Sequence, residues 1–244
     1  MYAAKIRKIW YILEVHDLWP ESIVQFWLLK RESFLFSLLK KYEQKIYASA
    51  KHIIALTSWV WEGIRSLIPD QSQKISLLYF IAQKIENIWE NPYPKLGVDI
   101  WRREIYLFAG NMNEAYNFAQ AKDFIQSRQD LFFVFIWDGS QKKYIQENIA
   151  HYQNVLMLPR MSKQELEKYV YYCDGIFIPL KDDTFYKGTF PVKWIEAIVN
   201  DKKIIFWWPD DWEFALFLKR LENNEVSKEI FGKQYFANEL CLII

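Results

Sequence analysis

The stretch Phe190-Pro191-Val192-Lys193-Trp194-Ile195-Glu196-Ala197 lies between two apolar runs, residues 175–180 and 203–208. Pro191 fits the first position of a helix, where a missing backbone N–H costs nothing. Lys193 and Glu196 are three residues apart and therefore share one face of that helix. A cation and a carboxylate at a helix start, just after a strand, can hold a phosphate and a sugar hydroxyl together. Lys193 and Glu196 could equally form a plain surface ion pair, so the surrounding sequence has to distinguish a binding site from an ion pair.

The sequence after Gly97 alternates regularly between short apolar runs and helical segments. The predicted strands are residues 104–109, 131–137, 154–158, 175–180 and 203–208. The predicted helices are residues 113–128, 141–150, 162–173, 191–200 and 210–221. Such alternation indicates βαβ units and a parallel sheet that helices cover on both faces. We expect one α/β domain over residues 98–215 and a helical tail over residues 216–244.

The first part of the chain predicts a smaller α/β region over residues 1–92. Its predicted strands are residues 9–15, 52–56 and 75–80, the last of which also suits a helix. Its predicted helices are residues 21–30, 33–50 and 57–68, where Thr57 and Ser58 can cap the third. Residues 91–97 hold two prolines and a glycine, which favours a linker.

Composition narrows the class of protein. Hydrophobic residues make up 52% of the 244 residues, enough for a core, and the net charge of +1 gives no electrostatic case for nucleic acid. Aromatic residues reach 18%, which suits sugar or membrane contacts, although core packing accounts for most of them. Two cysteines and three histidines show no metal-ligand spacing, so no metal is expected.

The sequence shows no signal peptide and no apolar run of about 20 residues, so we expect a cytoplasmic protein without a transmembrane segment. A peripheral position at the inner face of the membrane is left open. The candidate lipid-facing residues are Lys5, Arg7, Lys8, Trp10, Lys40, Lys41 and Lys45. A simply solvated face is the alternative for all of them.

Ligands of parallel α/β sheets bind at the carboxyl ends of the strands. Glycines and polar side chains follow four of the predicted strands there. They are Gly110-Asn111, Asp138-Gly139, Pro159-Arg160 and Lys181-Asp182-Asp183, and the segment after the last carries Gly188. Ordinary turns also explain the first two pairs. The pattern predicts that these groups converge at one rim.

The order of these pieces resembles the C-terminal half of a family 4 (group 1) glycosyltransferase of the GT-B type. The matching runs are Tyr106-Leu-Phe-Ala-Gly-Asn111, Phe133-Val-Phe-Ile-Trp-Asp-Gly139, Asn154-Val-Leu-Met-Leu-Pro159, Ser162-Lys-Gln-Glu-Leu166, Cys173-Asp-Gly-Ile-Phe-Ile-Pro-Leu180 and Pro191-Val-Lys-Trp-Ile-Glu196. Glu14-Val-His-Asp-Leu-Trp-Pro-Glu-Ser22 resembles a motif of the bacterial branch that builds surface polysaccharides and lipid-linked oligosaccharides. Ala50-Lys-His-Ile-Ile-Ala-Leu-Thr-Ser58 resembles the last part of the family's N-terminal domain. The resemblance covers about residues 3 to 215 and implies a Rossmann-like C-terminal domain.

The resemblance implies a nucleotide diphosphate sugar as donor and co-substrate, with no other cofactor. Glu196 matches the carboxylate that holds the donor ribose, and Lys193 matches the cation that faces the diphosphate. Gly188 falls where the family often has a first carboxylate, which this chain lacks. Met112, Asn113 and Glu114 stand where the family often has basic residues. The expected donor-binding residues are Gly110, Asn111, Asp138, Gly139, Arg160, Gly188, Pro191 and Val192.

The N-terminal part is implied to serve the acceptor, a glycan or a lipid-linked oligosaccharide. His16 matches a histidine near the transferred sugar, and a strand-end histidine bonded to backbone is the alternative. Asp17, Trp19 and Glu21 would lie on the acceptor side. We therefore expect His16, Lys193 and Glu196 to be the catalytic residues of a retaining, metal-independent hexosyltransferase.

The N-terminal domain is shorter than the family's. Its three candidate strands are a remnant, and a remnant edge is exposed unless it is paired. A second chain that completes the domain, or a fragmentary sequence, explains this equally. The alternative function is accordingly a non-catalytic or partner-dependent nucleotide-sugar-binding subunit. An unrelated α/β interaction protein is a third hypothesis, which donor binding would exclude.

Overall fold

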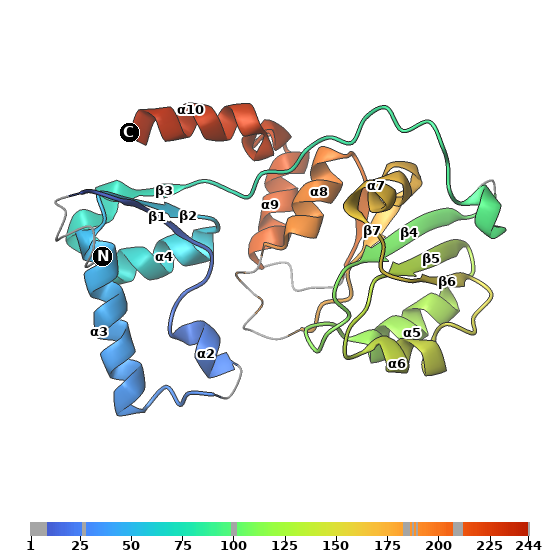
Figure 1. Cartoon of the computed structure of the whole chain (residues 1–244), viewed down its shortest axis with the longest axis horizontal. Helices are drawn as coiled ribbons and strands as arrows, with labels where there is room; N and C mark the ends of the chain where they lie inside the picture. Colours follow the sequence, from blue (N-terminus) through green and yellow to red (C-terminus); the bar gives the residue numbers. More distant parts are fainter. Residues whose placement is uncertain are drawn as a thin grey trace. The chain divides into compact units, whose positions relative to one another are not determined.

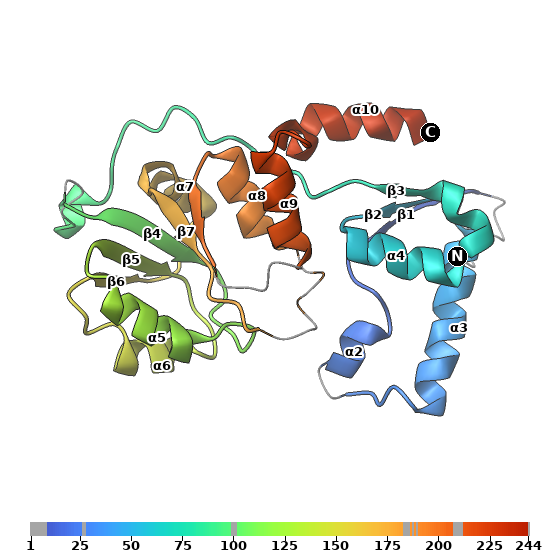
Figure 2. The ribbon, with the colours of Figure 1, turned by 180° about the vertical axis from the view of Figure 1, so that it is seen from behind.

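A computed structural model describes residues 9–25, 28–98, 102–182, 186, 188, 190–206 and 212–243. The chain divides into two compact units (Figures 1 and 2). Unit 1 comprises residues 1–81, 184–190 and 210–244, and unit 2 comprises residues 82–183 and 191–209. From the sequence we expected domains over residues 1–92 and 98–215 and a separate tail over residues 216–244.

Unit 2 is built on a parallel sheet, as predicted. Its described part holds five strands in the order β6-β5-β4-β7-β8, and every pairing is parallel. The strands are β4 (Glu104–Ala109), β5 (Leu131–Ile136), β6 (Val155–Leu158), β7 (Gly175–Phe177) and β8 (Lys203–Ile205). β7 ends three residues earlier than predicted, because the backbone of residues 179–181 turns to bond the loop after β4.

The helices of unit 2 follow the predicted order. They are α5 (Phe118–Ser127), α6 (Lys142–Asn148), α7 (Lys163–Tyr172) and α8 (Val192–Val199). Ser162 caps α7 by accepting from the Glu165 N–H at 3.2 Å. The prediction that the helix before β5 begins at Asn113 is wrong. Asn117 caps α5 instead, accepting from the Gln120 N–H at 3.1 Å, and Asn113 accepts from Ala115 in a preceding turn.

Aromatic side chains fill the core of unit 2. Phe108, Phe133 and Phe135 of the sheet are buried against Phe118 of α5 and Phe177 of β7. Several of these rings meet edge to face, for example Phe133 and Phe177 with centroids 5.1 Å apart. Core packing therefore accounts for much of the aromatic content.

Residues 91–97, predicted as a linker, belong to unit 2. They include a short 3₁₀ helix, η2 (Pro94–Leu96), which ends at Gly97 with a positive φ of 74°. The Tyr93 ring is fully buried, and its hydroxyl donates to the Tyr169 carbonyl of α7 at 2.9 Å. This buried tyrosine fixes the segment to the domain, so the prolines mark a packed turn.

Unit 1 holds a smaller parallel sheet, with three strands in its described part, in the order β1-β2-β3. The strands are β1 (Ile12–Val15), β2 (His52–Ala55) and β3 (Ile75–Leu77), and a 3₁₀ helix, η1 (Pro69–Lys74), precedes β3. The helices are α2 (Glu21–Gln25), α3 (Phe34–Ser49) and α4 (Ser58–Leu67). The predicted helix over residues 21–30 is wrong beyond Gln25: residues 28–33 are not helical, and Ser33 caps the new helix α3.

The C-terminal segment packs within unit 1. It forms α9 (Glu213–Glu222), the 3₁₀ helix η4 (Lys228–Phe231) and α10 (Lys233–Ile243). The Glu213 carboxylate accepts the N–H groups of Ser58 at 2.6 Å and Trp59 at 3.0 Å, at the start of α4. A carboxylate at a helix N-terminus stabilises that helix. In the ranges that the structure describes, no helix combines the length and apolarity needed to cross a membrane.

Candidate functional site

Gly110 lies where β4 ends, and its backbone makes room for a lysine. Its φ is +133°, which favours glycine, and its N–H donates to the Ile136 carbonyl at 3.0 Å. A Cβ at this position would lie 2.7 Å from both Cε and Nζ of Lys193. Gly110 and Lys193, predicted as site residues from separate parts of the sequence, are therefore direct neighbours.

The Lys193 ammonium group is held by aromatic side chains. It donates to the Tyr116 hydroxyl at 2.8 Å and lies 4.6 Å from the ring centroid of Phe108. Among the described side chains, no carboxylate comes within 4.0 Å of it, so the surface ion pair with Glu196 is not formed. Burial lowers the pKa of Lys193 to about 8, against an ordinary value of 10.5. The more distant Glu196 carboxylate opposes this fall only in part. A half-buried cation without a close counter-charge is costly, and a bound anion such as a phosphate would relieve that cost.

Glu196 lies one turn further along α8. Its side chain is exposed at one side, while desolvation by the surrounding protein raises the pKa of the carboxyl group. Lys163 and Lys193 oppose that rise. Pro191 occupies the N-cap position of α8, but its side chain has no oxygen that could accept a hydrogen bond from the first N–H groups of the helix. Val192, the next residue, is exposed. The first two turns of α8 therefore present a helix N-terminus, a cation and a carboxylate.

The loop after β5 is locked against the loop after β4. The Met112 N–H donates to the Asp138 carbonyl at 2.9 Å, and the Gln141 N–H donates to the Met112 carbonyl at 2.8 Å. Gly139 has a φ of +152°, and a Cβ there would collide with the Met112 carbonyl oxygen and approach Asn111 Oδ1 to 2.6 Å. The structure thus brings Gly110, Asn111, Asp138 and Gly139 together.

Trp137 and Arg160 extend the same rim. Trp137 has a φ of +132°, and such strain at a non-glycine residue is common at functional sites. The Arg160 guanidinium lies over the Trp137 ring, 4.6 Å from its centroid. Asp138 accepts from the Gly139 N–H at 2.9 Å, and this bond, followed by Lys142, lowers the pKa of Asp138. Lys181 and Asp182 are exposed, and Asp183 lies outside the described residues.

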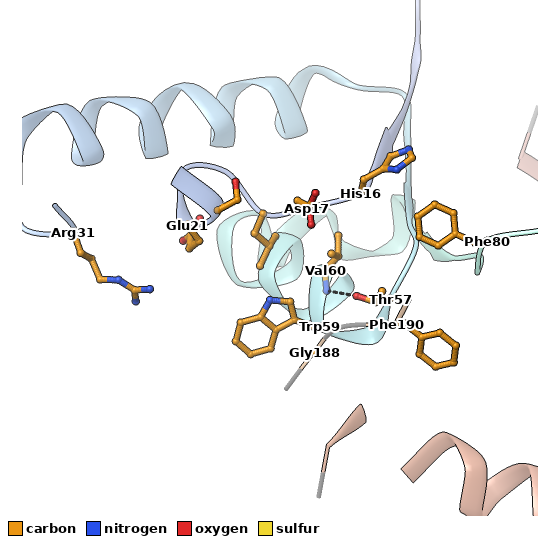
Figure 3. Close-up of a pocket in the computed structure, with 12 residues that line it drawn as sticks. His16, Asp17, Glu21, Arg31, Thr57, Trp59, Val60, Phe80, Gly188 and Phe190 are labelled. Carbon is orange, nitrogen blue, oxygen red and sulfur yellow. Dashed lines mark hydrogen bonds between the residues drawn. The ribbon is translucent and has the colours of Figure 1, made fainter. Parts of the chain in front are cut away.

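Unit 1 has a cavity of about 500 Å³ of its own (Figure 3). Three of the expected acceptor-side and catalytic residues line it, namely His16, Asp17 and Glu21. His16 Nε2 lies 2.8 Å from Glu14 Oε1, so this histidine contacts a carboxylate and not the backbone. Its ring also meets Phe80 edge to face at 5.3 Å. Trp19 lines a neighbouring groove between β1 and α3.

Arg31 and Trp59 are among the lining residues of the cavity that were not predicted as site residues (Figure 3). Trp59 follows the cap of α4, just past the carboxyl end of β2, so the strand-end rule applied to β2 indicates it. Arg31 lies in the connection before α3, where no sequence pattern indicates a site residue. Gly188 also lines the cavity, and a Cβ on it would collide with the Trp59 side chain. The packing at position 188 thus leaves no room for a longer side chain in this arrangement.

A polar network fixes the residues around Glu21. Lys40 of α3 pairs with Glu21 and with Glu43, both at 2.7 Å. The buried Glu43 also accepts from the Tyr47 hydroxyl at 2.6 Å and from the Trp19 N–H at 3.1 Å. Lys40, one of the candidate lipid-facing residues, therefore uses its charge within the unit. Lys5, Arg7 and Lys8 lie outside the described residues.

The described residues contain no cluster of side chains that could hold a metal ion. A comparison with protein-family models found no match. The probable glycosyltransferase WbjE of Pseudomonas aeruginosa is 21% identical over 201 residues, which are 80% of this chain and 50% of WbjE. The chain thus spans about half the length of this curated relative.

Solved structures of glycosyltransferases have a similar fold. Anabaena Alr3699/HepE in complex with UDP superposes with a TM-score of 0.64 at 11% identity, over 94% of this chain and 67% of that one. WaaG, a glycosyltransferase involved in lipopolysaccharide biosynthesis, gives a TM-score of 0.59 at 14% identity, over 86% and 59%. A glycosyltransferase from Rickettsia africae gives 0.57 at 12% identity, over 98% and 73%. The expected GT-B type of α/β fold is confirmed.

Proposed function

We propose that this chain is a glycosyltransferase that moves a sugar from a nucleotide diphosphate sugar to a glycan or lipid-linked acceptor in bacterial polysaccharide biosynthesis. The observation that carries the proposal is the half-buried Lys193 ammonium beside Gly110, which has no carboxylate within 4.0 Å among the described residues. A donor diphosphate supplies the missing negative charge. The relatives support the donor class, since HepE was solved with UDP and with UDP-glucose.

The donor residues divide the work by their chemistry. Lys193 and the first turn of α8 stabilise the charge that develops on the departing diphosphate, which is why we propose that no metal is needed. Glu196 accepts hydrogen bonds from the ribose hydroxyls. Gly110 and Gly139 let the backbone approach the phosphates. Arg160, stacked on Trp137, adds a second cation at the rim.

Residues of unit 1 serve the acceptor in this proposal. His16 assists the transferred sugar, and Asp17, Trp19 and Glu21 contact the acceptor. We also propose that the reaction retains the configuration of the transferred sugar, and that the chain belongs to the surface-polysaccharide branch of family 4. Both proposals rest on the motif order and on the likeness to WbjE.

A partner-dependent nucleotide-sugar-binding subunit is the second candidate function. The glycine at position 188, where a carboxylate is expected, and the non-basic residues after Gly110 favour it. In this form a second chain would complete the N-terminal sheet next to β1.

Donor turnover separates the two functions. Purified protein is incubated with UDP- and GDP-sugars, with and without a membrane extract as acceptor source, and release of the nucleotide diphosphate is followed. A transferase releases it in an acceptor-dependent way, and His16→Ala abolishes the release. Donor binding without any release, in the same preparation, would refute catalysis by this chain alone.

A further inference from the structure

The C-terminal end of helix α8 is tied to residues 82–90, a segment without helix or strand that we call the strap. The tie is the side-chain amide of Asn200, the C-cap residue of α8. Its Oδ1 accepts from the Ile85 N–H at 2.7 Å, and its Nδ2 donates to the Gln83 carbonyl at 3.3 Å. An amide carries both a donor and an acceptor, so this one side chain satisfies two backbone groups of the strap.

The same side chain also holds α8 itself. Asn200 Nδ2 donates to the Glu196 carbonyl oxygen at 2.8 Å, and the Asn200 backbone N–H donates to the same oxygen at 3.1 Å. Glu196 is the residue whose carboxylate we assign to the donor ribose. A single amide therefore lies between the strap and the residue that is to meet the donor.

Helix α8 is short and tightly packed, so its two ends move together. Lys193 stands in its first turn, and Asn200 directly follows its last residue. A helix of this length spans ~12 Å. Four of its side chains are buried, namely Trp194, Ile195, Ala197 and Ile198. Because close-packed interiors transmit strain, a shift at the C-cap reaches the donor-binding side chains.

The strap is the stretch by which the chain enters unit 2. The first stretch of unit 1 ends at Ile81, and unit 2 begins at Ala82. Figures 1 and 2 show the chain after β3 passing the C-terminal end of α8 on its way to η2. Farther along, the Tyr172 hydroxyl of α7 donates to the Ile88 carbonyl at 2.8 Å. The strap thus has one anchor at α8 and another at α7.

We propose that Asn200 is a positioning residue for donor binding. It fastens the strap to α8 and so holds Glu196 where the ribose hydroxyls of the donor meet its carboxylate. This inference rests on the proposed function, because it takes Glu196 as the acceptor of those hydrogen bonds. Coupling of this kind is reciprocal: if the intact clasp favours donor binding, bound donor favours the intact clasp. The donor site then responds to the segment through which the chain passes from one unit to the other.

Calorimetric titration with UDP and with 2′,3′-dideoxy-UDP tests the positioning role. Asn200→Ala should weaken UDP binding about fivefold or more, at the low end of couplings between sites. Binding of 2′,3′-dideoxy-UDP should stay unchanged, because this ligand has no ribose hydroxyls for Glu196. Asn200→Asp puts an oxygen against the carbonyls of Gln83 and Glu196, so it should behave like Asn200→Ala. E196A/N200A should bind UDP no more weakly than Glu196→Ala does.

Hydrogen exchange of the Ile85 N–H, followed by NMR in the full chain, measures the clasp from the other side. Saturating UDP should slow this exchange about fivefold in the wild type, by the reciprocity of the coupling. It should leave the exchange unchanged in Glu196→Ala. The wild-type measurement needs no substitution, so a poorly folded variant cannot obscure it.

Two variants control for a general loosening of the strap. Tyr172→Phe removes the hydrogen bond to the Ile88 carbonyl. Lys84→Ala removes an exposed ion pair with Asp201, in which the two charged groups lie 3.4 Å apart. Both variants should bind UDP like the wild type. Circular dichroism spectra verify that each variant is folded.

Two results would overturn this inference and leave the proposed function standing. In the first, Glu196→Ala weakens UDP binding but Asn200→Ala binds UDP like the wild type. In the second, Asn200→Ala weakens the binding of UDP and 2′,3′-dideoxy-UDP equally, because the residue then supports the domain as a whole and not the ribose contact. A folded wild type that binds neither nucleotide would instead refute the proposed function, and this inference with it.

Discussion

Replacing Lys193 by methionine removes a half-buried ammonium group and keeps a side chain of similar length. In the folded protein the pKa of this lysine falls from 10.5 to about 8, because burial disfavours the charged form. At pH 7 that difference corresponds to about 3 kcal/mol of lost stability. The substitution also deletes the hydrogen bond to Tyr116, which contributes about 1 kcal/mol. The ligand-free variant should therefore be more stable than the wild type by about 2 kcal/mol.

The pH dependence follows from the direction of the shift. Between pH 8 and 10.5 the unfolded chain binds more protons at this lysine than the folded protein does. The stability of the wild type should therefore rise across this window relative to that of the variant. The advantage of Lys193→Met is complete below pH 8 and nearly gone by pH 10.

Donor binding should respond in the opposite sense. A hydrogen bond to a charged group contributes about 1.5–3 kcal/mol, so Lys193→Met should weaken UDP binding about ten- to hundredfold. The assays are urea denaturation at pH 7 and pH 10 and calorimetric titration with UDP. Lys122→Met, on the surface of α5, is the control and should change neither quantity. If Lys193→Met destabilises the protein at pH 7, the ammonium already has its counter-charge and the reasoning fails.

Three further substitutions test the surroundings of the two sites. Gly110 has a positive φ, and a Cβ there would lie 2.7 Å from Lys193, so Gly110→Ala should lower the free energy of unfolding in urea by about 1–3 kcal/mol and weaken UDP binding. The control Gly97→Ala, with open space around the new Cβ, should leave UDP binding unchanged. Gly188→Glu introduces a carboxylate that meets Trp59, so thermal denaturation should show a lower Tm; an unchanged Tm with tighter UDP binding would contradict this packing. Glu213→Ala leaves the Ser58 and Trp59 N–H groups without their acceptor and should lower the free energy of unfolding by about 1–3 kcal/mol, whereas a loss below about 0.5 kcal/mol would show that water replaces the carboxylate.

Elements with a strong local pattern were predictable from the sequence. β4 has the predicted bounds, since an apolar run between charged residues and a glycine leaves little freedom. The capped starts of α3 and α7 were also predictable, because Ser33 and Ser162 directly precede helical stripes. The start of α5 was not, because two asparagines compete for the cap and only the tertiary turn at Asn113 decides between them.

Only those features of the candidate site that depend on short stretches of sequence were predictable. The strand-end rule indicated Gly110 and Asp138, and the helix spacing indicated Lys193. The surroundings of the lysine were not predictable, because Phe108 and Tyr116 reach it across more than 70 residues of sequence. The ion pairs of Lys40 were not predictable either, because the sequence does not show that the fold places this lysine beside two carboxylates.

Calorimetric titration of the wild type, Lys193→Met and Glu196→Ala with UDP and UDP-sugars tests the central claim that unit 2 binds a nucleotide diphosphate sugar. The account predicts binding by the wild type, a loss of about tenfold or more with Lys193→Met, and a loss with Glu196→Ala that disappears when the ligand is 2′,3′-dideoxy-UDP. A folded wild type that binds none of a panel of uridine and guanosine diphosphate sugars would contradict it.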